Sequence, residues 1–114
     1  MPPQTVTLLR KARALVRQGW AQGHSARTHD GHAVPAYKDD ATSFCTVGAA
    51  MRVHKRAGYH YHTYAAALDL LCRGAGVTSG FSGLTQWNDH PQRTRAEVLD
   101  LYTRAIARAQ EEIQ

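Results

Sequence analysis

The chain has 114 residues, a net charge of +5 and 43% hydrophobic residues, values typical of one folded domain rather than a disordered segment. We therefore expect residues 1–114 to form a single domain. No apolar run approaches the roughly 20 residues that a membrane span requires, and the first residues lack the charged and apolar regions of a signal peptide. We expect a cytoplasmic protein with no membrane partner. The positive charge permits binding to a polyanion, but we favour solubility as its role.

Two cysteines, Cys45 and Cys72, occur in the chain. They do not form a C-x-x-C pair, so neither a zinc-ribbon nor a thioredoxin motif is present. In a reducing compartment such residues pack as buried thiols rather than forming a bridge. We therefore expect both side chains to be reduced and buried.

The first helix is predicted over residues 5–18. Thr5 is a candidate N-cap and Gly19 a candidate stop. Between them, apolar residues recur on one helical face: Leu8, Leu9, Ala12, Leu15 and Val16.

Residues 19–42 show no helical periodicity. The pair Asp30–Gly31 lies between two short runs and is typical of a hairpin turn. Structureless loops longer than about 12–15 residues are uncommon in compact domains. We therefore expect this segment to be either a binding loop or partly mobile.

Two further helices are predicted in the middle of the chain. Thr42 or Ser43 is the candidate N-cap of a helix over residues 44–56, and Thr63 is the candidate N-cap of a helix over residues 64–73. Each is followed by glycine, which favours a helix end.

The last elements are a corner and a long helix. Residues 84–91 are predicted to form one turn of helix and then a sharp corner. Thr94 and Glu97 have the spacing of a capping box, and an apolar stripe follows, so we predict one continuous helix over residues 94–113 with Thr94 as its N-cap. Together the elements predict a mainly α fold, a compact bundle of about four helices. A long irregular loop, with a candidate short β-hairpin, follows the first helix.

A nucleophilic thiol is the sharpest candidate chemistry. Cys45 is predicted near a helix N-terminus, where the dipole lowers the pKa of a thiol. His62 or His60 would act as the base, and Asp89 or Asn88 would orient it. Such a site would make the chain a Cys-dependent hydrolase or transferase.

The alternative, which we favour, gives Cys45 a structural role. A glycine inside a helix costs about 1 kcal/mol relative to alanine, so Gly48 indicates that another backbone packs closely against it. Cys45 would then fill a small slot beside that contact.

The chain contains seven histidines, which raises the question of a metal site. Zinc needs three or four converging ligands, and no spacing here matches a ligand pattern. We favour surface histidines, and expect no metal and no cofactor. The histidines concerned are His24, His29 and His32 in the long loop, and His60 and His62 after the second predicted helix.

Basic residues next to tyrosines suggest contact with nucleic acid, because stacking and phosphate binding then combine. Arg52, Lys55 and Arg56 precede three tyrosines at positions 59, 61 and 64. No helix-turn-helix, RNA-recognition or zinc-finger pattern is present. The alternative is that the tyrosine rings pack inside with their hydroxyls in water.

A candidate binding surface joins two irregular segments. Each places a tryptophan beside polar residues that can donate and accept hydrogen bonds. The alternative is that both tryptophans pack into the core and the polar groups satisfy each other. The candidate binding residues are Trp20, Gln22, Trp87, Asn88, Asp89 and Arg93.

Three stretches carry a family resemblance: residues 19–23 (GWAQG), 45–50 (CTVGAA) and 87–94 (WNDHPQRT), the last followed by Glu97–Val98. They resemble a family of small actinobacterial and actinophage proteins that is a domain of unknown function. The resemblance extends from Leu8 to Ala109. It implies a bacterial or phage context and brings no activity, substrate or catalytic residue.

The sequence therefore favours a small non-enzymatic binding or regulatory protein, phage-encoded and acting on a host macromolecule, with a protein as one candidate partner. A nucleic-acid-associated accessory protein is the alternative. A Cys-dependent enzyme is the third hypothesis.

Overall fold

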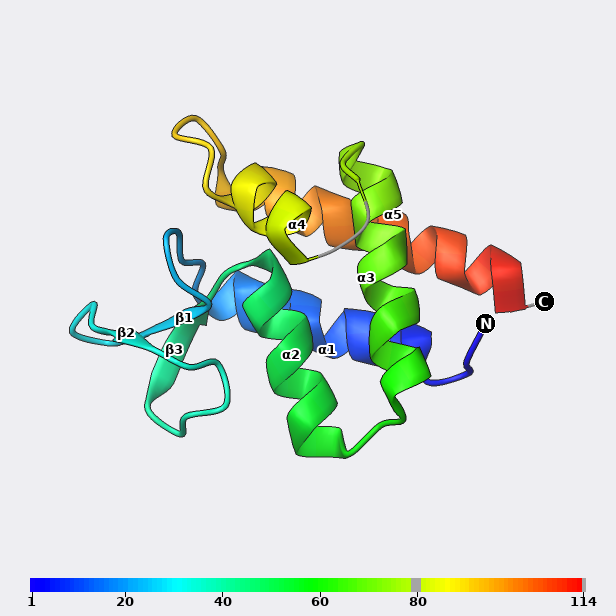
Figure 1. The fold of residues 1–114 in the computed structure, drawn as a ribbon, viewed down its shortest axis with the longest axis horizontal. Helices are drawn as coiled ribbons and strands as arrows, with labels where there is room; N and C mark the ends of the chain where they lie inside the picture. Colours follow the sequence, from blue (N-terminus) through cyan, green and yellow to red (C-terminus); the bar gives the residue numbers. More distant parts are fainter. Residues whose placement is uncertain (79–80, 114) are drawn as a thin grey trace.

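The computed structural model describes residues 1–78 and 81–113, which form five α-helices and a three-stranded antiparallel sheet (Figure 1). The expected mainly helical fold is confirmed, but the expected number of helices was one too low. In chain order the elements are α1 (Thr5–Gln18), β1 (Ala26–Thr28), β2 (Ala33–Val34), β3 (Ala41–Phe44), α2 (Thr46–Ala57), α3 (Tyr61–Ala75), α4 (Phe81–Asn88) and α5 (Arg95–Ile113).

Helices α1 and α5 lie side by side and run in opposite directions, and α3 packs against both (Figure 1). The predicted stripe of α1 forms much of the core, where Leu8, Leu9, Ala12 and Val16 are fully buried. Gly19 ends this helix as predicted, since its N–H donates to Leu15 O at 3.0 Å. Thr5 is not the N-cap: that position belongs to Gln4, and Thr5 is the buried first residue of the helix.

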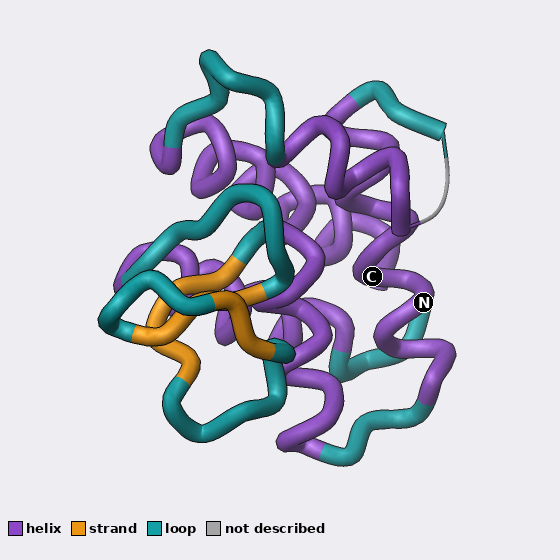
Figure 2. Tube along the Cα trace, turned by 60° about the vertical axis from the view of Figure 1, so that its left-hand side comes forward, coloured by secondary structure: helices purple, strands orange, loops and turns teal. Residues whose placement is uncertain are grey.

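The sheet lies at the end of the molecule opposite the start of α1 and the end of α5 (Figure 2). Its strand order is β2-β1-β3. The predicted hairpin is confirmed: β1 pairs with β2 across a turn in which Gly31 has a φ of 88°. That left-handed conformation favours glycine. The segment after α1 is therefore more regular than predicted, because β3 also pairs with β1.

The starts of α2 and α3 differ from the prediction. Thr42 and Ser43 lie in β3 instead of capping a helix, and the N-cap of α2 is Cys45, whose sulfur accepts from Gly48 N at 3.2 Å. The N-cap of α3 is His60, whose ring accepts from the backbone N–H of His62, so that helix begins before Thr63. Both caps use side chains outside the usual set of Ser, Thr, Asp and Asn.

Gly48 confirms the expected close approach of another backbone. A Cβ at this position would overlap the carbonyl oxygen of Ser25. The N–H of Cys45 donates to the same oxygen at 3.0 Å. The first turn of α2 is therefore packed directly onto the loop that leads into β1.

The final helix confirms the predicted capping box. Glu97 N donates to Thr94 Oγ1 at 3.2 Å, and the Glu97 carboxylate accepts from Thr94 N at 3.0 Å. The helix then continues unbroken to Ile113. In the described part of the chain, no helix combines the length and the apolar character needed to cross a membrane.

Candidate functional site

The corner after α4 is organised by Asn88, the last residue of that helix, which is fully buried. Its Oδ1 accepts hydrogen bonds from Trp20 Nε1 at 2.8 Å, Thr46 N at 2.9 Å and Thr46 Oγ1 at 2.7 Å. Its Nδ2 donates to Ala21 O at 3.0 Å and to Asp89 Oδ1 at 2.9 Å. One carboxamide therefore fastens together the segment after α1, the start of α2 and the end of α4.

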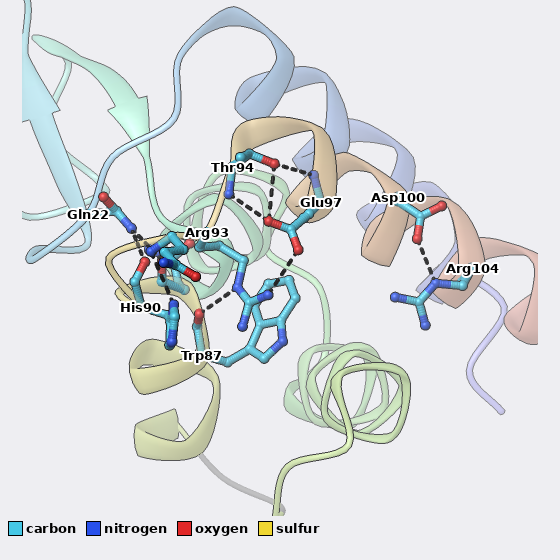
Figure 3. Close-up of polar contacts among 10 residues, drawn as sticks. Gln22, Trp87, His90, Arg93, Thr94, Glu97, Asp100 and Arg104 are labelled. Carbon is cyan, nitrogen blue, oxygen red and sulfur yellow. Dashed lines mark hydrogen bonds and ion pairs between the residues drawn. The ribbon is translucent and has the colours of Figure 1, made fainter.

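Gln22 adds a second link between the segment after α1 and the corner after α4. Its Nε2 donates to Asn88 O at 3.0 Å and to His90 O at 2.9 Å, and Figure 3 shows the side chain directed at the His90 turn. One residue later, Gly23 N donates to Asp89 Oδ1 at 2.9 Å. Gln22 and Gly23 therefore donate to three acceptors of the corner, which are Asn88 O, His90 O and Asp89 Oδ1.

Arg93 closes the other side of the corner. Its Nε donates to Trp87 O at 2.9 Å, and its guanidinium lies over the Trp87 ring, 3.9 Å from the centroid (Figure 3). It also forms an ion pair with Glu97 at 3.2 Å. The cation therefore ties the corner to the first turn of α5.

The structure thus brings together all six predicted binding residues: Trp20, Gln22, Trp87, Asn88, Asp89 and Arg93. Most of their polar groups bond to one another or to nearby backbone. Asp89 is exposed and Asn88 is buried. A ligand would therefore contact Asp89 directly, whereas Asn88 would act only by holding the surrounding segments in place.

A cleft of about 270 Å³ lies beside this corner, between the loop after α1 and helix α4. Sequence reasoning missed most of its walls. The one available signal was the spacing of Thr85, in α4, and Asp89, directly after it, because residues four apart lie on one side of a helix. The cleft is lined by Gly23, His24, Ser25, Cys45, Phe81, Thr85 and Asp89.

Cys45 contributes to this cleft but is only 2% exposed. Burial raises the pKa of its thiol, and the carboxylate of Asp89 adds to that rise, although the hydrogen bond from Gly48 N opposes it. A buried thiol with a raised pKa stays protonated at neutral pH, which is the opposite of what a nucleophilic cysteine needs.

Of the three predicted catalytic residues, Cys45 and Asp89 share the cleft and His62 does not. His62 lies in the first turn of α3, beyond the far end of α2, and the 12 residues of α2 span about 18 Å. Its ring stacks on His60 with centroids 4.7 Å apart. The histidine that lines the cleft is His24.

The histidines were also candidates for a metal site. Across residues 1–78 and 81–113, no group of three or more His, Cys, Asp or Glu side chains is placed to hold a metal ion. The three histidines of the long loop, His24, His29 and His32, are exposed.

The predicted basic residues separate into two environments. Arg52 and Arg56 line a groove between α1 and α2 with Lys11, whereas Lys55 is exposed and not part of that lining. The Tyr64 ring stacks on His54 with centroids 4.8 Å apart, and burial raises the pKa of Tyr64 to about 12. Tyr64 is therefore partly buried, in the direction that the alternative interpretation of the tyrosines expected, whereas Tyr61 is 67% exposed and does not follow it.

Comparison with known proteins gives one family. No match was found among curated proteins or among solved structures. A family model described as a family of unknown function matches residues 1–108, nearly the whole chain, and confirms the expected kinship with such a family. The chain belongs to DUF6197, a family of unknown function.

Proposed function

We propose that this protein is a non-enzymatic binding protein and that its ligand enters the cleft beside the Asn88 corner. The observation that carries the proposal is the combination of an open cleft with walls held rigid by hydrogen bonds. Gly23 and Asp89 both line it, and Gly23 N donates to Asp89 Oδ1 at 2.9 Å. Rigid walls lower the entropic cost of binding, because little must be ordered when the ligand arrives.

The lining fits a segment of a protein partner. Phe81 is 47% exposed, which offers apolar area at the rim. Ser25, Thr85 and Asp89 supply hydroxyl groups and a carboxylate for a polar or cationic side chain. An apolar contact beside a few placed polar groups is the usual composition of a recognition pocket.

Binding is favoured over catalysis because no activated nucleophile is found among the described residues that line the cleft. The Cys45 thiol has a raised pKa and its sulfur accepts the hydrogen bond that caps α2. The resemblance to actinobacterial and actinophage proteins supports extending the proposal to a host macromolecule as the partner.

A photo-crosslinking experiment tests this proposal. We would replace Phe81 by p-benzoylphenylalanine, which keeps an aromatic ring at the rim, and irradiate cells that express the protein. The expected result is one discrete adduct. The same amino acid at the exposed position Gln110, on α5, should not give it.

Two matched variants decide whether the adduct depends on the cleft. Thr85→Arg fills the cleft and should abolish the adduct, whereas Gln86→Arg makes the same charge change on the exposed face of α4 and should retain it. Cys45→Ser should also retain it. Equal adducts from Phe81 and Gln110, or an adduct that survives Thr85→Arg, would show that the cleft is not the binding site.

A further inference from the structure

A second surface, unrelated to the cleft, has the composition of an anion site. A groove of about 310 Å³ between α1 and α2 is lined by three cations, Lys11, Arg52 and Arg56. The rest of its lining is apolar and consists of Leu15, Val53 and Ala57. Cations above an apolar floor suit a ligand that is charged at one end and flat or apolar at the other.

Arg52 is fixed in place before any ligand arrives. One guanidinium nitrogen donates to Ala36 O at 2.9 Å and to Lys38 O at 2.7 Å. The guanidinium also lies over the Phe44 ring, 5.3 Å from its centroid. A cation held in this way loses little side-chain entropy on binding.

The neighbouring guanidinium of Arg56 adds positive potential to the same groove. Burial lowers the pKa of Arg52, and the charge of Arg56 lowers it further, while Asp39 opposes the shift. Two like charges side by side are stabilised by any anion that lies between them.

Arg56 already holds a carboxylate, because it forms an ion pair with Asp39, whose side chain is 96% exposed. An ion pair this exposed contributes little to stability. Asp39 is therefore an internal competitor that an incoming anion displaces at small cost.

Tyr37 contacts Arg56 through its backbone. The backbone carbonyl of Tyr37 lies 3.5 Å from an Arg56 guanidinium nitrogen, and its side chain is 51% exposed. Its ring is not part of the groove lining, so an apolar part of a ligand would contact Leu15, Val53 and Ala57.

We infer that the groove between α1 and α2 binds the phosphate of a nucleotide unit through Lys11 and Arg56, with the nucleoside against the apolar floor, whether the nucleotide is free or part of a single strand. Paired guanidinium and ammonium groups match a phosphate, and arginine can hold two of its oxygens at once. The net charge of +5 favours the approach of such a ligand.

The test uses fluorescence anisotropy with a labelled single-stranded 12-nucleotide DNA at low salt. Arg56→Gln and Lys11→Gln should each weaken binding about tenfold, since each removes a charged hydrogen-bond donor. Lys55→Gln, which makes the same charge change on α2 outside the groove lining, should change binding less than about twofold.

The opposite change gives a gain of affinity. Asp39→Asn releases Arg56 and should tighten DNA binding about threefold. Asp40→Asn makes the same charge change at the next exposed residue and should tighten binding less, since it only alters the net charge. Circular dichroism confirms that each variant is folded. Because Asp39→Asn removes only an exposed pair, it keeps the inference testable even if a groove variant fails to fold.

Competition identifies the source of the phosphate. Displacement of the DNA by AMP at comparable phosphate concentration would indicate a free nucleotide, and displacement only by an unlabelled strand would indicate a strand; both support the groove. Three results would overturn the inference. Polyglutamate could displace the labelled DNA as strongly as unlabelled DNA does, or Lys55→Gln and Arg56→Gln could lose equal affinity. The third is that the unaltered protein binds neither DNA nor AMP.

Discussion

The indole N–H of Trp20 donates a 2.8 Å hydrogen bond to Oδ1 of Asn88, which lies 68 positions later in the chain. The same oxygen also accepts from the backbone and the hydroxyl of Thr46. Three segments that are distant in sequence therefore meet at one buried amide. The arrangement explains how an irregular loop and a short helix can form the fixed walls of a cleft.

Replacing Asn88 by alanine should destabilise the protein by about 3–5 kcal/mol, because several buried donors lose their acceptor at once. Urea unfolding followed by circular dichroism measures the change. Gln92→Ala, on the exposed part of the same corner, should stay within about 0.5 kcal/mol. An Asn88→Ala loss below about 1 kcal/mol would mean that the amide does not hold the corner.

Replacing Gly48 by alanine should cost more than about 2 kcal/mol, because the new methyl group overlaps the Ser25 carbonyl and one of the two backbones must move. Thermal unfolding of the variant measures the loss. Lys55→Ala, on the exposed surface of the same helix, serves as the control and should change stability little. A Gly48→Ala variant as stable as the control would contradict the close backbone contact.

The elements that sequence predicted well are those specified by local signals. The bounds of α1 follow from a stripe of apolar residues and the glycine at position 19, and the start of α5 follows from Thr94 and Glu97 alone. The turn at Asp30–Gly31 is equally local, since a left-handed glycine defines it.

The elements that were missed depend on distant partners. Residues 41–44 carry no strand periodicity of their own and become β3 by pairing with β1. Cys45 and His60 cap helices although neither is a usual cap, so Thr42, Ser43 and Thr63 were wrongly preferred. The cleft is also a product of tertiary structure, because its walls come from three separate parts of the chain.

Replacing Thr94 by alanine should lower stability by about 1 kcal/mol, since the first turn of α5 loses the hydroxyl that accepts from Glu97 N. Thr94→Ser retains the hydroxyl and should recover most of the loss. Chemical unfolding of the three proteins under one set of conditions measures both effects. Equal destabilisation by Ala and Ser would show that the methyl group of Thr94, and not its hydroxyl, matters.

Glu97 gives the capping box a dependence on pH. The backbone N–H of Thr94 lowers the pKa of Glu97, helped by the Thr94 hydroxyl and by Arg93. A folded-state pKa below the unfolded one favours the folded state above the ordinary glutamate range, and this contribution is lost as pH falls through the folded value. The difference in melting temperature between the unaltered protein and Glu97→Gln should therefore shrink on acidification. A difference that is constant from neutral to acidic pH would contradict this.

The Cys45 thiol should react slowly with thiol reagents in the native protein. It is 2% exposed, burial raises its pKa, and its sulfur accepts from Gly48 N. The thiolate is the reactive form, so both the low accessibility and the raised pKa slow the reaction. In a Cys72→Ala background, labelling should be at least about a hundredfold slower than for an added exposed cysteine, because it must await local or global opening. The added cysteine is introduced by Gln110→Cys in the same background.

Labelling rates measured in urea test whether burial is the reason that Cys45 reacts slowly. If burial protects the thiol, the rate should rise with urea in step with unfolding and approach that of the exposed control once the chain is unfolded. Raising the pH toward 8.5 should accelerate the exposed control more than native Cys45, because opening limits the latter. Rapid labelling of native Cys45 at pH 7 would mean that the thiol is exposed and activated, and it would bring back the Cys-dependent enzyme as the better interpretation of the cleft.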